Sequence, residues 1–479
     1  MVFSSILFLF YFLAPLMVIY MLVPQRYKNL TLLISSLVFY SWGEPTYIIL
    51  MLFSILFNYA IGFFIDRSKS KFSVTVACVV NIGLLLVFKY SDFFISTVNS
   101  VIRTNFPLLN LALPIGISFY TFQAMSYCID LYRGKTKLQR NFVSFGLYIS
   151  FFPQLIAGPI VRYDDIALQL GNHPQRVTMF SDGVCRFAAG LAKKVLIANN
   201  FGKLWELTNN GGEISMLSAW LGIIAYTIQI YYDFSGYSDM AIGLGKMFGF
   251  EFCENFNYPY ISKNITEFWR RWHMSLSSWF KEYVYFPLGG SRIYAEDYSK
   301  TTRIAGYALT PERKAQARIY LNLLIVWMLT GMWHGASFNF IAWGLYYGIL
   351  LIVEKRYLIK KLSKMPYIVK LLYTMILVMI GWVFFASADF ASAFRYLGCM
   401  FNVTNIGFTD NAFLYRFFSY AIMLIVAIVG ATPIPGKLFN KATESRFYWL
   451  RPVLAFVAVV VCTAYLIDDT YNPFLYFRF

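Results

Sequence analysis

The sequence has 479 residues, of which 58% are hydrophobic and only 14% are charged, and its formal net charge is +17. This composition excludes an ordinary soluble domain, in which about a quarter of the residues are charged. The positive charge does not indicate a nucleic-acid partner, because the cations gather in short loops between long apolar runs, as they do in membrane proteins.

Several apolar runs are long enough to cross a membrane. A spanning helix needs roughly 17 to 25 apolar residues, and runs near that length cover 5–23, 47–64, 72–88 and 452–467. Such runs predict a helix bundle and exclude a barrel, whose strands would be short and alternating. We therefore expect an all-α, polytopic bundle of roughly ten or more spans with additional re-entrant or interfacial helices.

Basic loops set the expected orientation. They occur at 26–28, 67–71, 133–140, 355–364 and 437–451. Because short basic loops stay in the cytosol, placing them inside puts the amino terminus outside, and the last apolar run leads the chain out again. The sequence thus predicts a multi-pass protein in contact with membrane lipid, with both termini outside.

No repeat, low-complexity linker or soluble domain is visible, so we expect a single membrane domain over 1–479. The pattern is uneven, because Gly, Pro, Asp, Asn, Arg and Trp interrupt 157–318. Irregular backbone is tolerated at membrane depth only where it is buried in protein or lines a wet cavity. We expect a polar tunnel or catalytic region within 157–353 and an extracellular aromatic tail at 468–479.

A helix start is expected in this polar region. Asn264 is followed three residues later by Glu267, the pattern of a cap that satisfies the first free amides. In the helix that follows, four-residue spacing places Trp269, His273 and Ser277 on one face. We interpret the segment as a re-entrant or interfacial element.

Only three histidines are available as proton acceptors at neutral pH. His334 lies in the almost uncharged run 319–352, where an ionisable residue is a functional candidate and a packing role is the alternative. Its glycine neighbours are expected to leave room for another group. His273 lies among Trp, Arg and Ser, and its alternative role is to anchor a helix at the membrane interface. His173 is expected to be a loop residue.

A basic cluster follows the same segment. It consists of Arg270, Arg271, Lys281 and Arg292. Acyl transfer needs a base, donors for the oxyanion and aligned substrates, and a histidine with a pKa near 6.5 meets the first need. The basic cluster would suit the phosphates of coenzyme A, and contact with lipid headgroups is the alternative. Pro and Gly residues within 286–292 predict a turn.

Two carboxylates stand beside apolar helices. Asp233 and Asp239 flank Ser235 in the segment 231–239. Buried carboxylates need partners, so they could pair with Arg or orient a histidine, and a structural ion pair or helix cap is the alternative. The six cysteines show no spacing typical of a zinc site or a disulfide framework. We expect no metal.

Four stretches together resemble the membrane-bound O-acyltransferase superfamily. They are 152–159, 232–239, 269–292 and 333–335. The resemblance is to the membrane subunit of bacterial alginate O-acetylation, with peptidoglycan O-acetylation and teichoic-acid D-alanylation as relatives. It implies a many-helix bundle around a transmembrane tunnel in the bacterial cytoplasmic membrane. It also implies that His334 is the essential histidine and His273 the second polar position.

The function that the resemblance implies is O-acetyl transfer. Acetyl groups would move from cytosolic acetyl-CoA across the membrane toward hydroxyls of an extracellular polysaccharide, with an extracellular or periplasmic acetyltransferase as partner. D-Alanyl transfer from a carrier protein, a non-enzymatic anion transporter and a non-catalytic scaffold are the alternatives. The residues expected to support the site are Trp333, Asp233, Ser235, Asp239 and Trp269.

The carboxyl-terminal segment 473–479 is aromatic, and resting in the membrane interface would explain it. Through Phe474, Tyr476 and Phe479 it also resembles the tyrosine-containing terminus of a small partner protein of the D-alanylation system. A phenol, with a pKa of about 10, is a far better leaving group than a serine hydroxyl, so an acyl-tyrosine keeps much of a thioester's transfer potential. We hypothesise that Tyr476 accepts the acetyl group, with His334 as base, and passes it to the extracellular transferase.

Overall fold

The computed structural model describes most of the chain, and its residues form two compact units. The described ranges are 2–156, 158–171, 173, 176–209, 214–289, 302–304, 307–309, 311–403, 406–444, 449–468 and 475. Unit 1 comprises Met1–Leu204, Ile228–Asn255 and Pro433–Phe479, and unit 2 comprises Trp205–Thr227 and Phe256–Thr432. The single domain expected from the sequence stays a prediction.

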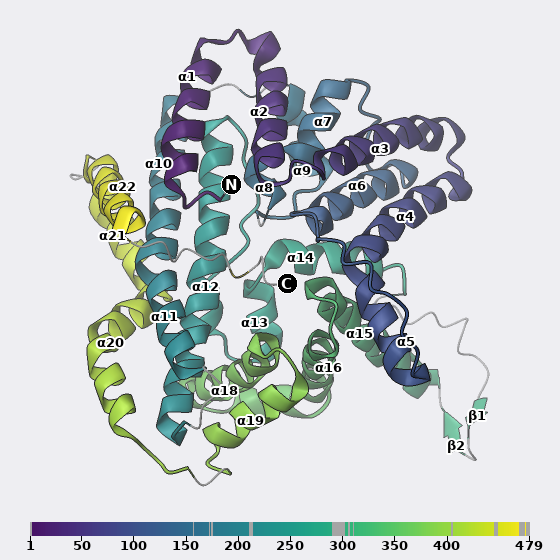
Figure 1. Ribbon diagram of the computed structural model, residues 1–479. Coiled ribbons are helices and arrows are strands. Elements are labelled where there is room, and N and C mark those ends of the chain that lie inside the picture. Colours follow the sequence, from purple (N-terminus) through teal and green to yellow (C-terminus); the bar gives the residue numbers. More distant parts are fainter. Residues whose placement is uncertain are drawn as a thin grey trace. The chain divides into compact units, whose positions relative to one another are not determined.

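Unit 1 is helical in the part that the structure describes (Figure 1). Its α-helices are α1 (Ala14–Leu22), α2 (Lys28–Gly43), α3 (Ile48–Ser68), α4 (Lys71–Leu85), α5 (Ser91–Ile102), α6 (Ile117–Tyr132), α7 (Phe142–Ser150), α8 (Phe152–Leu155), α9 (Tyr163–Gly171), α10 (Val177–Ala192), α21 (Ile434–Glu444) and α22 (Leu450–Asp468). Shorter 3-10 or π segments are η1 (Leu7–Leu13), η2 (Gln25–Tyr27), η3 (Leu86–Tyr90) and η4 (Lys193–Ala198). Two helices, α11 (Asn199–Thr208) and α12 (Met216–Met247), contain the unit boundaries.

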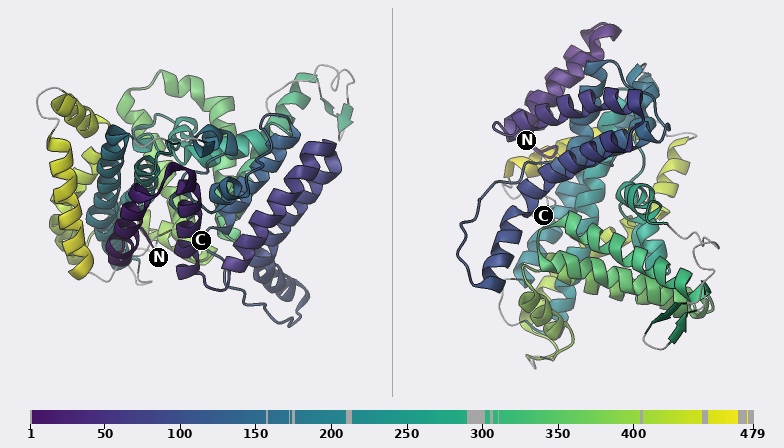
Figure 2. Two further views of the ribbon diagram at one scale, coloured as in Figure 1. Left: turned by 90° about the horizontal axis from the view of Figure 1, so that it is seen from above. Right: turned by 90° about the vertical axis from the view of Figure 1, so that its right-hand side faces the viewer.

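Unit 2 contains the remaining helices and one short hairpin. The helices are η5 (Pro259–Ile261), α13 (Ile265–Arg271), α14 (Met274–Phe280), η6 (Lys281–Tyr285), α15 (Pro311–His334), α16 (Phe338–Val353), η8 (Glu354–Leu358), α17 (Ile359–Ser363), α18 (Tyr367–Ala386), α19 (Phe390–Met400) and α20 (Asn411–Gly430). Strands β1 (Thr302–Ile304) and β2 (Tyr307–Leu309) pair antiparallel, and the hairpin stands at the start of α15 in both views of Figure 2. The expected turn after Tyr285 is confirmed over 286–289.

Five helical segments of the described chain are long and apolar enough to cross a membrane. They are Ile48–Ser68, Lys71–Ile102, Tyr367–Ala386, Asn411–Gly430 and Leu450–Asp468. Only 11% to 33% of the most apolar stretch of each helix is buried inside the protein, as expected for helices whose apolar surface contacts lipid. The all-α membrane bundle is confirmed, and the expected number of spans stays a prediction.

Within unit 1, glycines bring α10 and α12 into close contact. A Cβ added at Gly190 would lie 2.5 Å from the carbonyl oxygen of Gly236, and one added at Gly183 would lie 2.7 Å from that of Gly243. Only glycine permits backbones to approach this closely. The approach places the lysines at the end of α10 next to the carboxylates of α12.

Within unit 2, α15 and α16 form a closely packed antiparallel pair (Figure 1). A side chain at Gly344 would collide with the carbonyl of Trp327, and one at Gly331 would collide with that of Phe340. At Gly335 the ring of Phe340 already occupies the space. The room beside these glycines is therefore occupied by helix α16, and the expectation that it admits a reacting group stays a prediction.

Candidate functional site

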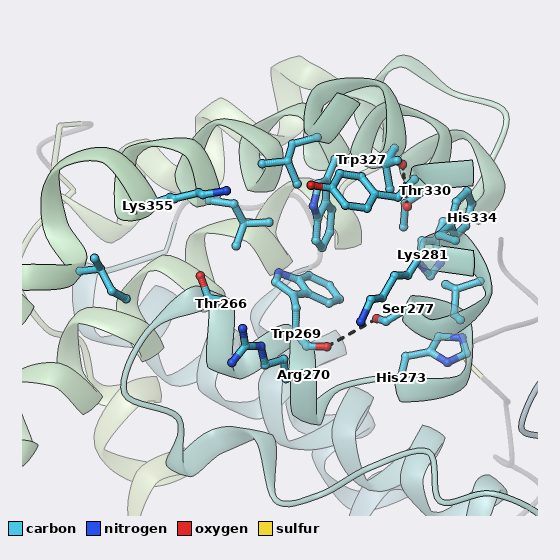
Figure 3. Close-up of a pocket in the computed structure, with 17 residues that line it drawn as sticks. Thr266, Trp269, Arg270, His273, Ser277, Lys281, Trp327, Thr330, His334 and Lys355 are labelled. Atoms are coloured by element: carbon cyan, nitrogen blue, oxygen red, sulfur yellow. Dashed lines mark hydrogen bonds between the residues drawn. The ribbon is translucent and has the colours of Figure 1, made fainter. Parts of the chain in front are cut away.

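A cavity of about 530 Å³ lies within unit 2 (Figure 3). Its wall is formed by α13, α14, η6, α15 and the stretch from the end of α16 to the start of α17. The described residues that line it include no aspartate or glutamate. Exposed side chains at Arg270, Lys281 and Lys355 bring the cavity to the protein surface.

The first helix of this wall, α13, is held at its amino-terminal end. The side chain of Asn264 accepts a hydrogen bond from the Glu267 amide at 2.7 Å, so the expected helix start is confirmed. The fully buried carboxylate of Glu354 accepts hydrogen bonds from the amides of Ile265 and Thr266 at 2.7 and 3.0 Å, and from the Thr266 hydroxyl at 2.9 Å. Because these first amides have no partner inside the helix and favour an anion, Glu354 fastens α13 to η8.

The backbone breaks at His273, so the single helix expected for this segment is wrong. His273 has a φ of 44° and separates α13 from α14. A residue other than glycine in this left-handed region costs roughly 1 to 3 kcal/mol, and such strain clusters at functional sites. The break still brings Trp269, His273 and Ser277 to the cavity wall, where the Ser277 hydroxyl donates a hydrogen bond to the Trp269 carbonyl at 3.5 Å.

Both candidate histidines line this cavity, as a shared site requires. His334 is the last residue of α15, and His273 and His334 are only 1% and 6% exposed. Trp333 contacts both imidazoles, with ring centroids 6.0 Å from His273 and 5.0 Å from His334. The rings of Trp343 and Phe385 meet His334 edge to face at 5.0 and 5.2 Å. Packing on these sides fixes the orientation of the His334 ring.

Burial makes His273 a weak base. The residue lies outside the five membrane-capable helices, and desolvation lowers the pKa of its imidazole to about 3. The ring is therefore neutral near pH 7, when it can exchange hydrogen bonds with a bound molecule without carrying charge. This electrostatic state suits positioning better than proton abstraction.

The cavity has two chemically different ends. His273 and His334 lie toward one end and Lys355 at the opposite end, as Figure 3 shows. Arg270 and Lys281 also line the cavity and add positive charge; in Figure 3 Arg270 lies below Trp269, and Lys281 lies on the histidine side with its side chain extending toward Ser277. Within the described part of the chain, none of the three cations forms an ion pair, although Lys281 lies 5.6 Å from the ring centroid of Phe286. An elongated molecule with an anionic end fits this arrangement.

The other predicted donor contacts do not line the cavity. Arg271 pairs with Glu267 at 2.9 Å and donates a hydrogen bond to the carbonyl of Asn257 at 3.1 Å. Arg292 lies outside the described residues, as does Tyr476. The donor-binding role of Arg271 and Arg292 stays a prediction.

The carboxylate cluster belongs to unit 1, and basic residues balance it. Asp233 pairs with Lys194 at 2.7 Å, and both side chains are at most 3% exposed. Asp239 pairs with Lys193 and with Arg186, each at 2.6 Å. The alternative of structural ion pairs accounts for these contacts, because each carboxylate has a cationic partner.

Two further contacts complete this cluster. The second oxygen of Asp233 accepts a hydrogen bond from the backbone N–H of Leu475 at 2.8 Å, so Leu475 is tied to α12. Leu475 is itself buried, with 4% of its surface exposed. Ser235 is buried, and its hydroxyl has no hydrogen-bond partner among the residues described.

Sequence reasoning missed two residues of this site. Lys355 was recognised only as part of a basic loop, although its place directly after an apolar run could have marked it as a residue at a cavity mouth. Glu354 could not be recognised, because a carboxylate beside the five basic residues of 355–364 is typical of a solvated charge. Among the described residues, no three His, Cys, Asp or Glu side chains gather as a metal site.

Comparison with known proteins gives a consistent family. The model of the membrane-bound O-acyltransferase family matches residues 137–298. The chain is 36% identical over 520 residues to the probable alginate O-acetylase AlgI of Azotobacter vinelandii, with all of both chains covered. It is 31% identical to the peptidoglycan O-acetyltransferase of Helicobacter pylori, covering all of this chain and 98% of the relative. The teichoic acid D-alanyltransferase of Bacillus subtilis is 30% identical over 51% of this chain and 60% of its own length.

Proposed function

The chain belongs to the membrane-bound O-acyltransferase family and is an acyltransferase, and we propose that it moves acetyl groups from cytosolic acetyl-CoA toward hydroxyls of an extracellular polysaccharide. One observation carries the proposal: one cavity has two histidines toward one end and, at the other, a lysine that forms no ion pair with a described residue. Acyl-transfer chemistry at one end and recognition of an anionic donor at the other need this polarity. Because the chain is an acyltransferase, the alternatives of a non-enzymatic transporter and a non-catalytic scaffold are set aside.

The cation end supports a cytosolic donor. Lys355 begins the basic stretch 355–364, which the distribution of positive charge assigns to the cytosol. The phosphates of acetyl-CoA would bind near Lys355 and Arg270, and the thioester would extend toward the histidines. The absence of acidic residues among the described lining favours such a polyanion.

At the other end, His334 acts as the base. It takes the proton of the accepting hydroxyl while the oxygen attacks the acetyl carbonyl. The carbon–oxygen bond forms, the carbon–sulfur bond breaks, and the thiolate of coenzyme A leaves and takes up the proton. His273 lines the same cavity and supports the reaction by positioning the acceptor or by sharing proton transfer.

The first acceptor in this proposal is Tyr476. The hydrogen bond between Leu475 and Asp233 supports it, because the residue before Tyr476 is fastened to a buried ion pair. An acetyl-tyrosine retains transfer potential, so an extracellular or periplasmic acetyltransferase can then move the group to the polysaccharide. This route requires both termini outside and the protein in the bacterial cytoplasmic membrane.

The relatives favour acetate over D-alanine as the group transferred. The probable alginate O-acetylase and the peptidoglycan O-acetyltransferase both align with the whole chain. The D-alanyltransferase aligns with about half of it.

Replacement of His334 by alanine tests the proposal. Cells that produce the His334→Ala protein should lose O-acetyl groups from their surface polysaccharide, because the base is missing. Quantifying the protein in isolated membranes controls for failed insertion. Unchanged acetylation by normally inserted His334→Ala protein contradicts the role of this histidine.

A further inference from the structure

A buried hydrogen-bond donor faces the middle of the cavity. Trp269 lines the wall and is 8% exposed, yet its indole N–H has no acceptor among the described residues. In Figure 3 its ring lies between Lys355 at one end and the histidines at the other. A buried donor left without an acceptor costs about 1 to 3 kcal/mol. Such a donor at a cavity wall is therefore suited to a bound molecule.

Three aromatic rings hold the indole in this orientation. The ring centroids of Trp327, Tyr347 and Trp343 lie 4.7, 4.8 and 5.6 Å from that of Trp269, each in an edge-to-face arrangement. The helix that carries Trp269 is itself held by the Glu354 carboxylate. The N–H is consequently oriented before any ligand arrives, which lowers the entropy lost on binding.

Trp382 provides a comparison with an indole outside the cavity wall. The N–H of Trp382 also lacks an acceptor in the described part of the chain, and this side chain is 1% exposed. Trp382 packs against Trp343 and Phe268 and does not line the cavity. Trp269, in contrast, is part of the cavity wall. This difference makes Trp382 a matched control.

We propose that Trp269 recognises the arm of the acyl donor by donating a hydrogen bond to an amide carbonyl oxygen on it. The inference rests on the proposed function, because it assumes a donor whose anionic end lies near Lys355 and whose thioester reaches the histidines. The pantetheine arm of coenzyme A connects such ends and carries two amide carbonyls. The same arm is present on acyl carrier proteins, so Trp269 reads chemistry that both donors share.

The location of the N–H separates this arm from other groups. Phosphates bind best near Lys355 and Arg270, where positive charge is available. The reacting carbonyl lies beside the imidazoles at the far end. A neutral amide carbonyl between these ends can accept a hydrogen bond from the neutral indole N–H of the aromatic wall. A cationic side chain at this place would be a poorer donor, because burying its charge costs free energy.

Binding measurements on the full chain test the proposal without relying on turnover. The probes are coenzyme A, pantetheine, which has the arm without the nucleotide, and adenosine 3′,5′-bisphosphate, which has phosphates without the arm. Trp269→Phe keeps an aromatic ring and removes the N–H. Calorimetry should show coenzyme A and pantetheine bound about three- to tenfold more weakly, with the bisphosphate unchanged.

Trp382→Phe, which removes an N–H outside the cavity, should leave all three affinities within about twofold. Equal affinities of Trp269→Phe and Trp382→Phe for pantetheine overturn the proposal, as does wild-type protein that binds the bisphosphate but not pantetheine. Loss of pantetheine binding in Trp269→Phe supports it even if wild-type protein transfers no acetyl group, a result that would count against the proposed function alone. A phosphopantetheinylated carrier protein as a fourth probe identifies which donor supplies the arm.

Discussion

The carboxylate cluster of unit 1 and the cavity of unit 2 both contain lysine and arginine side chains, but these differ in whether they form ion pairs. In the cluster, Asp233 and Asp239 each have cationic partners at 2.6 to 2.7 Å. In the cavity, Lys355 forms no ion pair with a described residue, and the Trp269 N–H has no acceptor there. Buried charges that are paired avoid the large cost of an uncompensated charge, whereas polar groups without partners at a cavity wall are suited to a ligand. The proposed function accordingly places the chemistry in the second region and gives the first a structural role.

One contact of the cluster goes beyond structure, because Asp233 also binds the backbone of Leu475. If the neighbouring Tyr476 carries the acetyl group, Tyr476→Phe keeps the aromatic side chain and removes only the nucleophile. We expect loss of nearly all surface O-acetyl groups, measured chemically on isolated polysaccharide. Full acetylation by a normally abundant Tyr476→Phe protein would eliminate the relay and leave the segment with an anchoring role.

The paired state of the cluster predicts a large stability effect. Lys194→Met leaves the Asp233 carboxylate buried without its cation, which should lower the free energy of unfolding by about 3 to 5 kcal/mol. Replacing both partners, as in Lys194→Met with Asp233→Leu, should restore most of the loss, because a buried ion pair and an apolar pair of similar volume are often equally stable. Thermal unfolding in detergent compares the three proteins. Similar unfolding midpoints for the single and double variants would contradict this, because the effect of removing Lys194 would then not depend on Asp233.

Substitutions of the cations that line the cavity should weaken donor binding and hardly change the stability of the protein. Lys355→Gln removes a cation from the donor end, and we expect the apparent KM for the donor to rise about tenfold with a smaller change in kcat, the pattern of lost uniform binding. Arg270→Gln and Lys281→Gln should behave similarly. Lys360→Gln, in the same basic stretch but outside the cavity lining, is the matched control. A fall in kcat at constant KM would move these cations into the catalytic group.

The smallest expected effect concerns Glu354. Glu354→Gln keeps one acceptor for the start of α13 and removes the charge that favours it, worth about 0.3 to 1 kcal/mol. Because α13 carries Trp269 and Arg270, we expect the donor KM to rise about two- to fivefold. Steady-state kinetics at saturating acceptor measures this change. An unchanged KM with reduced membrane abundance would limit Glu354 to a structural role.

Much of this molecule could be predicted from local sequence. The apolar runs predicted the bundle, and Asn264 predicted a helix start that the structure confirms. Both rest on short-range rules, namely hydrophobic length and the need to satisfy the first amides of a helix. The joint importance of His273 and His334 rested on the family resemblance, since a separation of 61 positions in the sequence carries no distance information.

The rest depended on contacts between distant residues. No local rule predicts the left-handed backbone at His273, because tertiary packing overrides helix propensity there. The glycines beside His334 suggested open space, yet Phe340 from the next helix fills it. Glu354 acts on amides 88 and 89 residues earlier in the chain. Such pairings become visible only when the helices are assembled.

The central claim is that the cavity binds the donor at one end and transfers its acetyl group at the other. Calorimetry and turnover on the same purified His334→Ala protein test it most directly. Because His334 lies at the end opposite Lys355, the variant should bind coenzyme A within about twofold of the wild type while acetyl transfer falls by roughly a hundredfold or more. Loss of coenzyme A binding together with activity, or retention of activity, would contradict the account.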